Sequence, residues 1–274
     1  MKQISFIIVA AALLLTPISA FPLAVPEPDL SELLDRQSIA DRLNDLIRRI
    51  RDGQITREAA RSRVQHLLTE AGDYYYQAGG ADIPKSEWYF PVAGSGPSAI
   101  AKGRKHGYSA RGYDFYAGNL HKGHPSLDIF IPDRNRESRD DRSGKPVQVL
   151  SMTSGVVVAA EDNWETGDHL RGGRYLWVYD PGNDLLVYYA HNERILVAVG
   201  DLVRPGDSIA TMGRSGYNAA KRRSPTHLHL TVLKVNRGRM TPIDVYSDIR
   251  KTKVQKKNYD RTTTQAPPHP RVHI

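Results

Sequence analysis

The sequence predicts a mainly β protein, in which an antiparallel, sheet- or sandwich-like domain follows an α-helical hairpin. Two observations support this fold class. Residues 28–80 carry apolar side chains at helical spacing, and after Trp88 short β-rich runs alternate with Gly, Pro, Asn and Asp. Parallel strands need long crossover connections, usually helices. Strands this close together, with no helix between them, therefore indicate antiparallel pairing.

The first part of the chain has the pattern of two helices joined by a tight turn. Asp29 is placed to cap the first helix, Asp52-Gly53 ends it, and a second helix starts near Thr56. The apolar stripes are Leu30, Leu33, Leu34, Ile39, Leu43, Leu46, Ile47 and Ile50, then Ala60, Val64, Leu67, Leu68 and Ala71. We therefore assign residues 21–85 to a helical hairpin segment.

Three roles remain open for this hairpin on the sequence alone. It is a packing module, an arm through which residues 28–80 bind other envelope or cell-division proteins, or a regulatory segment that covers an active site until it is removed.

Residues 86–249 have the pattern of the β domain. The predicted strands include 155–159, 175–179, 185–189 and 209–212, and residues 180–184 form a hairpin turn between two of them. A charged loop, 133–145, is inserted between strands. Residues 250–274 have almost no apolar content and are predicted to form a basic, disordered tail.

Composition excludes several kinds of chemistry. The 274 residues contain no cysteine, which rules out disulfides, thiol nucleophiles, thiolate zinc sites and iron–sulfur clusters. A metal site must therefore use histidine and carboxylate ligands, and the chain has ten histidines. The net charge of +8 comes mostly from the tail, where seven Lys and Arg face one acid. A nearly neutral body with a basic tail argues against nucleic-acid binding and suits attraction to an anionic polymer.

The N-terminus has the pattern of a secretory signal. Lys2 precedes an apolar run from Ile4 to Leu15, and Ile18-Ser19-Ala20 suits cleavage after Ala20. We predict residues 1–20 to be a signal peptide and the mature chain to have no transmembrane span. The protein is then exported to the periplasm, the cell envelope or the exterior of a bacterium. The alternative is an uncleaved membrane anchor.

The strongest metal-binding pattern is His227-Leu228-His229. In a strand the two histidines share one face, while the leucines between and after them face the core. Two imidazoles at this spacing can bind one ion. The alternative is a pair of polar residues on the solvated face of a sheet.

Two further histidine motifs are weak alone. His124 and Asp128 are too far apart on a regular strand to bind one metal, and Pro125 argues against a helix. The chain must therefore bend, with His124 in a loop and Asp128 entering a strand. His121 is an equal candidate for the first ligand on spacing alone. His191 ends the predicted strand 185–189 and has no second signal beside it.

The order of these motifs resembles a known family. Residues 88–94 (WYFPVAG), His124-x-x-x-Asp128, the 155–157 strand (GVV), Tyr189-Ala190-His191, Gly200-Asp201-x-Val203-x-x-Gly206-Asp207, Gly213-x-Ser215-Gly216, His227-Leu228-His229 and Pro242-Ile243-Asp244-Val245-Tyr246 follow one another. Over residues 86–248 this order is similar to the lysostaphin/LytM family of zinc endopeptidases.

The resemblance implies both a site and an activity. His124, Asp128 and His229 would bind one Zn²⁺, and His191 and His227 would be catalytic histidines that are not ligands. The fold would be an antiparallel β-sheet with the site in a groove. The substrate would be bacterial peptidoglycan, cut at peptide bonds in its cross-links or interpeptide bridges.

Some residues depart from the family pattern, and some alternatives stay open. Ser126 stands where the family usually has glycine, and Leu230 replaces the usual aromatic residue. His227 as a fourth protein ligand would close the metal site and leave a structural zinc. A second function is a non-catalytic scaffold of the same fold that activates other wall hydrolases, although such proteins typically lose ligands. Which of His191 and His227 acts as general base stays open.

Overall fold

The computed structural model describes residues 30–256, with side chains from residue 39 onward. The helices are α1 (Leu30–Arg51), α2 (Arg57–Gln77) and α3 (Tyr246–Ile249), with short 3₁₀ turns η1 (Lys85–Glu87), η2 (Pro97–Ala99), η3 (Arg104–Gly107) and η4 (Phe115–Leu120). The strands are β1 (Ser126–Phe130), β2 (Arg139–Asp140), β3 (Lys145–Pro146), β4 (Gln148–Leu150), β5 (Gly155–Glu161), β6 (Arg174–Asp180), β7 (Leu185–Ile195), β8 (Leu202–Val203), β9 (Ser208–Met212), β10 (His227–Asn236) and β11 (Arg239–Pro242).

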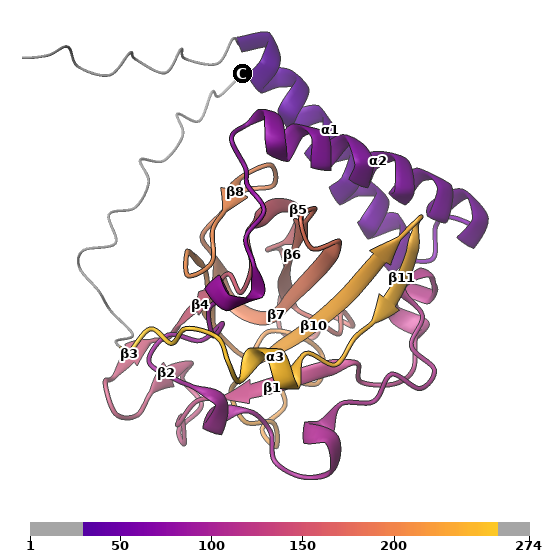
Figure 1. The fold of residues 1–274 in the computed structure, drawn as a ribbon. Helices are drawn as coiled ribbons and strands as arrows, with labels where there is room; N and C mark the ends of the chain where they lie inside the picture. The colour runs from indigo at the N-terminus through magenta and orange to yellow at the C-terminus, as the bar shows by residue number, and fades with distance from the viewer. Residues whose placement is uncertain (1–29, 257–274) are drawn as a thin grey trace, which may run out of the picture.

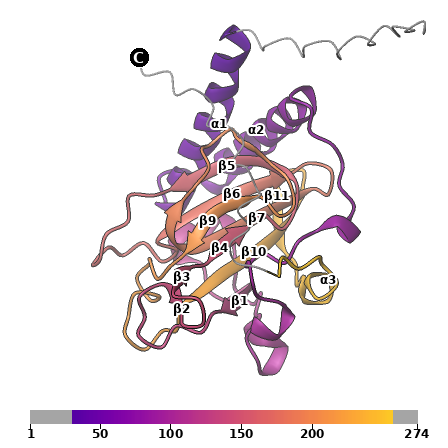
Figure 2. The same cartoon turned by 90° about the vertical axis from the view of Figure 1, so that its left-hand side faces the viewer.

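One antiparallel sheet dominates the fold (Figures 1 and 2). Its main path runs β1-β10-β7-β6-β5-β8, with β11 beside β10 and with β9 bridging β7 and β4. The predicted strands are present and the predicted turn joins β6 to β7. The predicted charged loop, 133–145, folds partly into the small β2–β3 pair. The fold class predicted from the sequence is confirmed.

The helical hairpin is also confirmed. The hydroxyl of Thr56 caps α2 by accepting from the N–H of Ala59, and Gly53 adopts a φ of +68° in the turn after α1. Figures 1 and 2 show both helices lying across the sheet, away from β1. Asp29, the predicted cap of α1, lies outside the described residues.

The sheet separates two apolar cores, as strand alternation requires. Trp88, Phe90, Tyr189 and Leu230 belong to the core on one face. On the other face, the apolar stripes of α1 and α2 pack against side chains such as Val158 and Trp177. His229 and Thr231 alternate with Leu230 along β10, so the predicted site lies on the helix-covered face of the sheet.

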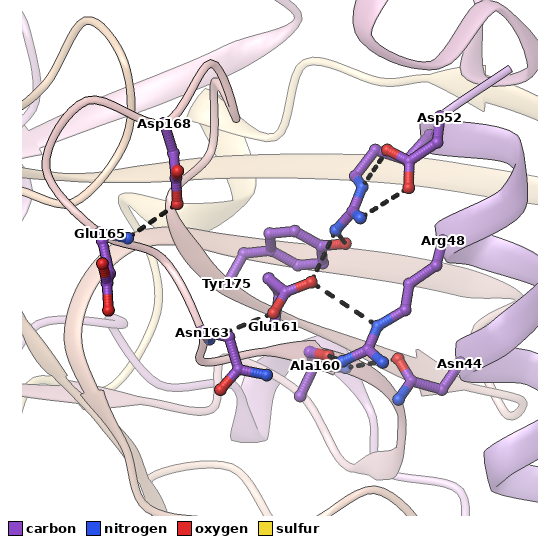
Figure 3. A network of polar contacts seen from close by, with 10 residues as sticks. Asn44, Arg48, Asp52, Ala160, Glu161, Asn163, Glu165, Asp168 and Tyr175 are labelled. Atoms are coloured by element: carbon purple, nitrogen blue, oxygen red, sulfur yellow. Dashed lines mark hydrogen bonds and ion pairs between the residues drawn. The ribbon is translucent and has the colours of Figure 1, made fainter.

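A polar cluster fixes α1 to the end of β5 (Figure 3). The Arg51 guanidinium donates to Glu161 (2.8 Å) and to the Tyr175 hydroxyl (3.0 Å), and Arg48 lies 3.6 Å from the same carboxylate. Asn44 accepts from the Ala160 N–H. Burial alone would raise the pKa of Glu161, but Arg51, the Asn163 N–H and Arg48 lower it. The Glu161 side chain is only 10% exposed, so it is poorly screened by solvent.

We expect Glu161→Ala to loosen α1. Two guanidinium groups would lose their shared carboxylate, at a cost of about 2–3 kcal/mol in the free energy of unfolding, measured by urea denaturation at pH 7. Because folding lowers the pKa of Glu161, its contribution is present at neutral pH and is lost as the pH falls below about 4. The difference between wild type and variant should therefore shrink in acid. Glu165→Ala, at an exposed residue in the loop that follows β5, is the control and should leave stability unchanged.

The predicted start of the disordered tail is wrong. Residues 250–256 are placed against the domain, because Lys253 accepts from the Phe90 N–H, donates its own N–H to Trp88, and pairs with Glu87 through its side chain. Backbone pairing with residues 88–94 compensates for the low apolar content. The rest of the predicted tail, 257–274, and the predicted signal peptide, 1–20, lie outside the described residues. The division at residue 85 stays a prediction.

Among the helices of residues 30–256, none is both long and apolar enough to cross a membrane.

Candidate metal and catalytic site

Pairing between β1 and β10 places the central carboxylate beside a histidine. Asp128 lies directly opposite His229, and Ser126 lies opposite Thr231. Residues opposite each other in an antiparallel pair share a face, so all four side chains point to the helix-covered side. His229 Nδ1 lies 3.1 Å from Asp128 Oδ1.

His124 reaches the same carboxylate from the segment just before β1. Its Nε2 lies 3.3 Å from Asp128 Oδ2, and its Nδ1 donates to the Gly107 carbonyl at 3.1 Å. Backbone hydrogen bonds in both directions with Ser109 fix the residue in place. The strand starts at Ser126, two residues earlier than predicted. His121 lines the nearby cavity but belongs to neither group of potential ligands among the described residues.

His191 reaches the site through an unusual backbone conformation. Ala190 pairs with His229, so simple alternation would turn the next side chain to the opposite face, where Tyr189 is buried. The φ of His191 is +67°, which is uncommon for a residue other than glycine. Its ring consequently lies 4.9 Å from that of His227 and 5.4 Å from that of His229. Such strain, worth about 1–2 kcal/mol, is typical of functional sites.

Backbone carbonyls orient the two additional histidines. His191 Nδ1 donates to the Ser215 carbonyl and His227 Nδ1 to the Pro225 carbonyl, each at 2.8 Å. Nε2 is then the free nitrogen of both rings when they are neutral. Gly216 has a φ of +107°, and a Cβ there would lie 2.4 Å from the Arg171 carbonyl oxygen and 3.0 Å from His191 Nδ1. The Gly-x-Ser-Gly turn thus allows the backbone to approach His191 closely.

The cluster shifts the pKa values of its members. Burial alone would raise the pKa of Asp128, but hydrogen bonds from His124 and His229 hold it well below its usual range. The hydrogen bond to Asp128 raises the pKa of His124. Burial lowers the pKa of His229 and lowers that of His191 further. At neutral pH Asp128 is therefore a carboxylate, and His191 and His229 are neutral imidazoles.

The arrangement fits a zinc ion. The nearest ligand atoms of His124, Asp128 and His229 lie within 4.8 Å of one another. Because His124 donates through Nδ1, its Nε2 lone pair faces a carboxylate oxygen, and two acceptors this close need a proton or a cation between them. Tetrahedral zinc with bonds of about 2.0–2.1 Å separates its ligand atoms by about 3.3 Å. The measured separations of 3.3 and 3.1 Å match that value.

A second group of three potential metal ligands shares His229 with the first group. The nearest nitrogens of His191, His227 and His229 also lie within 4.8 Å of one another, and His227 Nε2 lies 3.8 Å from Asp128 Oδ1. The five predicted side chains therefore form one cluster, in which His229 belongs to both groups.

A cavity of about 350 Å³ adjoins these residues. Its lining combines the histidine cluster with residues from α1, η4 and the sheet: Ile47, Ile50, Arg51, Phe115, Trp177 and Tyr188. Tyr113 also lines this cavity, whereas Tyr108 packs against the core on the other face of the sheet. The contribution of α1 was not visible in the sequence, because an amphipathic helix does not reveal which surface it covers.

Comparisons with known proteins agree with this picture. Residues 140–244 match peptidase family M23. A 105-residue segment is 33% identical to the outer membrane antigenic lipoprotein B of Haemophilus influenzae and covers 38% of this chain. The alignment spans only about a quarter, 23%, of that relative.

Solved structures of peptidases are similar at lower identity. The catalytic domain of the antimicrobial peptidase lysostaphin from Staphylococcus simulans aligns with 20% identity and a TM-score of 0.37, over 56% of this chain and 95% of its own. A zinc-containing peptidase from Vibrio cholerae aligns with 22% identity and a TM-score of 0.35, over 61% of this chain and 41% of its own.

The family match includes His191, His227 and His229, while His124 and Asp128 precede it. The match extends through the sheet from β2 to β11, so this part of the chain is similar to peptidase family M23, in line with the resemblance to lysostaphin/LytM-type peptidases.

Proposed function

We propose that this protein is an exported zinc-dependent endopeptidase that hydrolyses peptide bonds in bacterial peptidoglycan, in its cross-links or interpeptide bridges. One observation carries the proposal. Two imidazoles and a carboxylate converge as a potential ligand set, and two further imidazoles stand beside them at the edge of a cavity. The similarity of residues 140–244 to a peptidase family supports the same reaction type.

His124, Asp128 and His229 would hold one Zn²⁺. Three protein ligands leave a fourth position for water or substrate. Zinc bound there would supply Lewis acidity, which lowers the pKa of water to about 7 and polarises the scissile carbonyl. His227, 3.8 Å from Asp128 Oδ1, is oriented by the Pro225 carbonyl and serves the reaction as a base or donor in this proposal.

His191 and His227 would move the protons of the reaction. Each donates Nδ1–H to a backbone carbonyl and keeps Nε2 as the proton-accepting atom. One Nε2 takes a proton from the attacking water, and the other ring, when protonated, donates to the oxyanion or to the leaving amine. Burial keeps His191 neutral at pH 7, which suits the accepting role, but the assignment between the two rings remains open.

The helical hairpin would form part of the substrate site. Ile47, Ile50 and Arg51 line the cavity, and the Glu161 cluster holds α1 in place. This favours a hairpin that is a permanent part of the substrate site over one that covers the site until it is removed, because removing α1 would expose Trp177 and Val158 to water. If a version starting at Trp88 proves more active than the mature chain, the covering role suggested by the sequence is the correct one.

The second candidate function is that of a non-catalytic scaffold of the same fold. The structure gives it little support, because such proteins typically lose metal ligands, whereas His124, Asp128 and His229 lie together here as a potential ligand set. Export to the periplasm or cell envelope, and partners other than peptidoglycan at residues 28–80, stay part of the proposal.

Peptidoglycan digestion tests the enzyme proposal directly. We expect purified residues 21–274 to release peptide fragments from peptidoglycan. A chelator should stop the release and added zinc should restore it, because the ion supplies the reactive water. Mass spectrometry of the fragments identifies the bond. Release that continues unchanged in chelator contradicts the zinc mechanism, and absence of release in both conditions, with zinc bound, favours the scaffold.

A further inference from the structure

Ser126 makes a contact with the metal cluster that the site as described does not use. Its Oγ lies 2.7 Å from His229 Nε2 and 2.6 Å from Thr231 Oγ1, and the residue is 1% exposed. Thr231 is itself buried. The three side chains form a continuous hydrogen-bonded row from β1 to β10, on the same face as Asp128.

The two nitrogens of His229 have different surroundings. Nδ1 faces Asp128 at 3.1 Å, on the side where His124 also lies, whereas Nε2 lies 2.7 Å from the Ser126 hydroxyl. A histidine that binds an ion through one nitrogen carries its proton on the other, and that N–H is normally given an acceptor. His124 follows this rule with the Gly107 carbonyl. For His229 the acceptor in the right place is Ser126.

We propose that Ser126 is a positioning residue for His229, holding Nε2 while Nδ1 faces the ion. The inference rests on the proposed zinc site. A hydroxyl can both donate and accept, so it serves both states of the ring. In the metal-free protein His229 donates Nδ1–H to Asp128, and Ser126 donates to Nε2.

With zinc bound, the hydrogen bond between Ser126 and His229 would reverse its direction. The ring would take its other neutral tautomer, with its proton moved from Nδ1 to Nε2 by exchange with water; Nε2–H would then donate to Ser126, and the Ser126 hydroxyl would donate to Thr231 Oγ1. Ser126 would thereby add a hydrogen-bond partner for the third ligand.

The test measures zinc affinity instead of cleavage. Zinc alone is titrated into the mature chain in competition with a chelating dye. Removing the acceptor of a ligand's N–H typically weakens metal binding by about 10–100-fold, so we expect Ser126→Ala to raise the Kd for zinc by that factor. Thr231→Val, which leaves Ser126 in place, should weaken binding less, and Thr231→Ser should restore it.

A matched control separates this role from simple loss of a buried hydroxyl. Ser151 is fully buried and donates to the Thr153 carbonyl at 2.8 Å, but it does not line the cavity. Ser151→Ala should lower stability and leave zinc affinity unchanged. Ring-nitrogen NMR gives a second readout. In wild type, zinc should move the His229 proton from Nδ1 to Nε2, and in Ser126→Ala that Nε2–H should exchange faster with water.

The outcomes are distinct. If Ser126→Ala binds zinc as tightly as wild type, the positioning role is wrong. If wild type binds no zinc, the proposed function fails and this inference fails with it. Tight zinc binding without any cleavage of peptidoglycan overturns the proposed function alone.

Discussion

Asp128→Asn is expected to abolish zinc binding and peptidoglycan cleavage together. Asp128 supplies one oxygen to His124 and the other to His229, at 3.3 and 3.1 Å. An amide of the same shape removes the negative charge that offsets the ion, and its NH₂ group cannot bind a metal. Zinc affinity should fall by more than the ~10–100-fold caused by losing a ligand's hydrogen-bond partner. Activity at limiting zinc should fall by the same factor.

His229→Ala should behave in the same way, since it removes the ligand shared by both groups. His66→Ala is the control, because the His66 side chain is 72% exposed on α2, pairs with Glu70 and lies outside the cluster. Asp162→Asn, at an exposed carboxylate outside the site, serves the same purpose for Asp128. Retention of full zinc affinity in Asp128→Asn would show that the ion, if any, is bound elsewhere.

The parts of the site that follow from local periodicity were predictable from the sequence. Strand alternation places His227 and His229 on one face with Leu228 and Leu230 in the core, and the structure has this arrangement. The turn residues 180–184 likewise set the pairing of β6 with β7. These predictions rest on a period of two residues, which the chain must obey wherever one face is buried.

The parts that depend on long-range pairing were not predictable in this way. Spacing left His121 and His124 equal, and only the placement of the chain beside Ser109 and Gly107 distinguishes them. The tail boundary failed for a similar reason, because polar residues such as Lys253 are held by backbone pairing and not by apolar burial. Amino-acid composition predicts which segments bury apolar side chains, but it does not predict which backbone groups form hydrogen bonds.

For His191, strand periodicity predicts the wrong face of the sheet, whereas the sequence motif correctly predicts a place beside the other histidines. Counting along β7 from Tyr189 and Ala190 would turn His191 away from the metal cluster, and the left-handed φ of +67° reverses this. The Ser215 carbonyl holds the ring once it is turned, and the ring fits closely against Gly216 because that residue has no side chain. A strained residue retained at this point is best explained by function.

Replacing His191 should therefore abolish cleavage and leave zinc in place. We choose His191→Asn for the decisive test, because asparagine tolerates the left-handed backbone that alanine does not. Loss of a proton-transfer group typically costs about 10²–10⁴-fold in rate, so release of fragments at saturating zinc should fall by that factor, with the zinc Kd unchanged. His191→Ala should show the same loss together with a lower free energy of unfolding.

His121→Asn is the matched control, because His121 lines the same cavity outside the cluster and should keep its activity within a few-fold of wild type. Two results would revise the assignment. If His191→Asn loses zinc, His191 is a ligand and the group His191, His227 and His229 holds the ion. If cleavage survives with zinc bound, the protons move through His227 alone, whose Nε2 lies within 4 Å of Asp128, and the strain at His191 must have a structural cause.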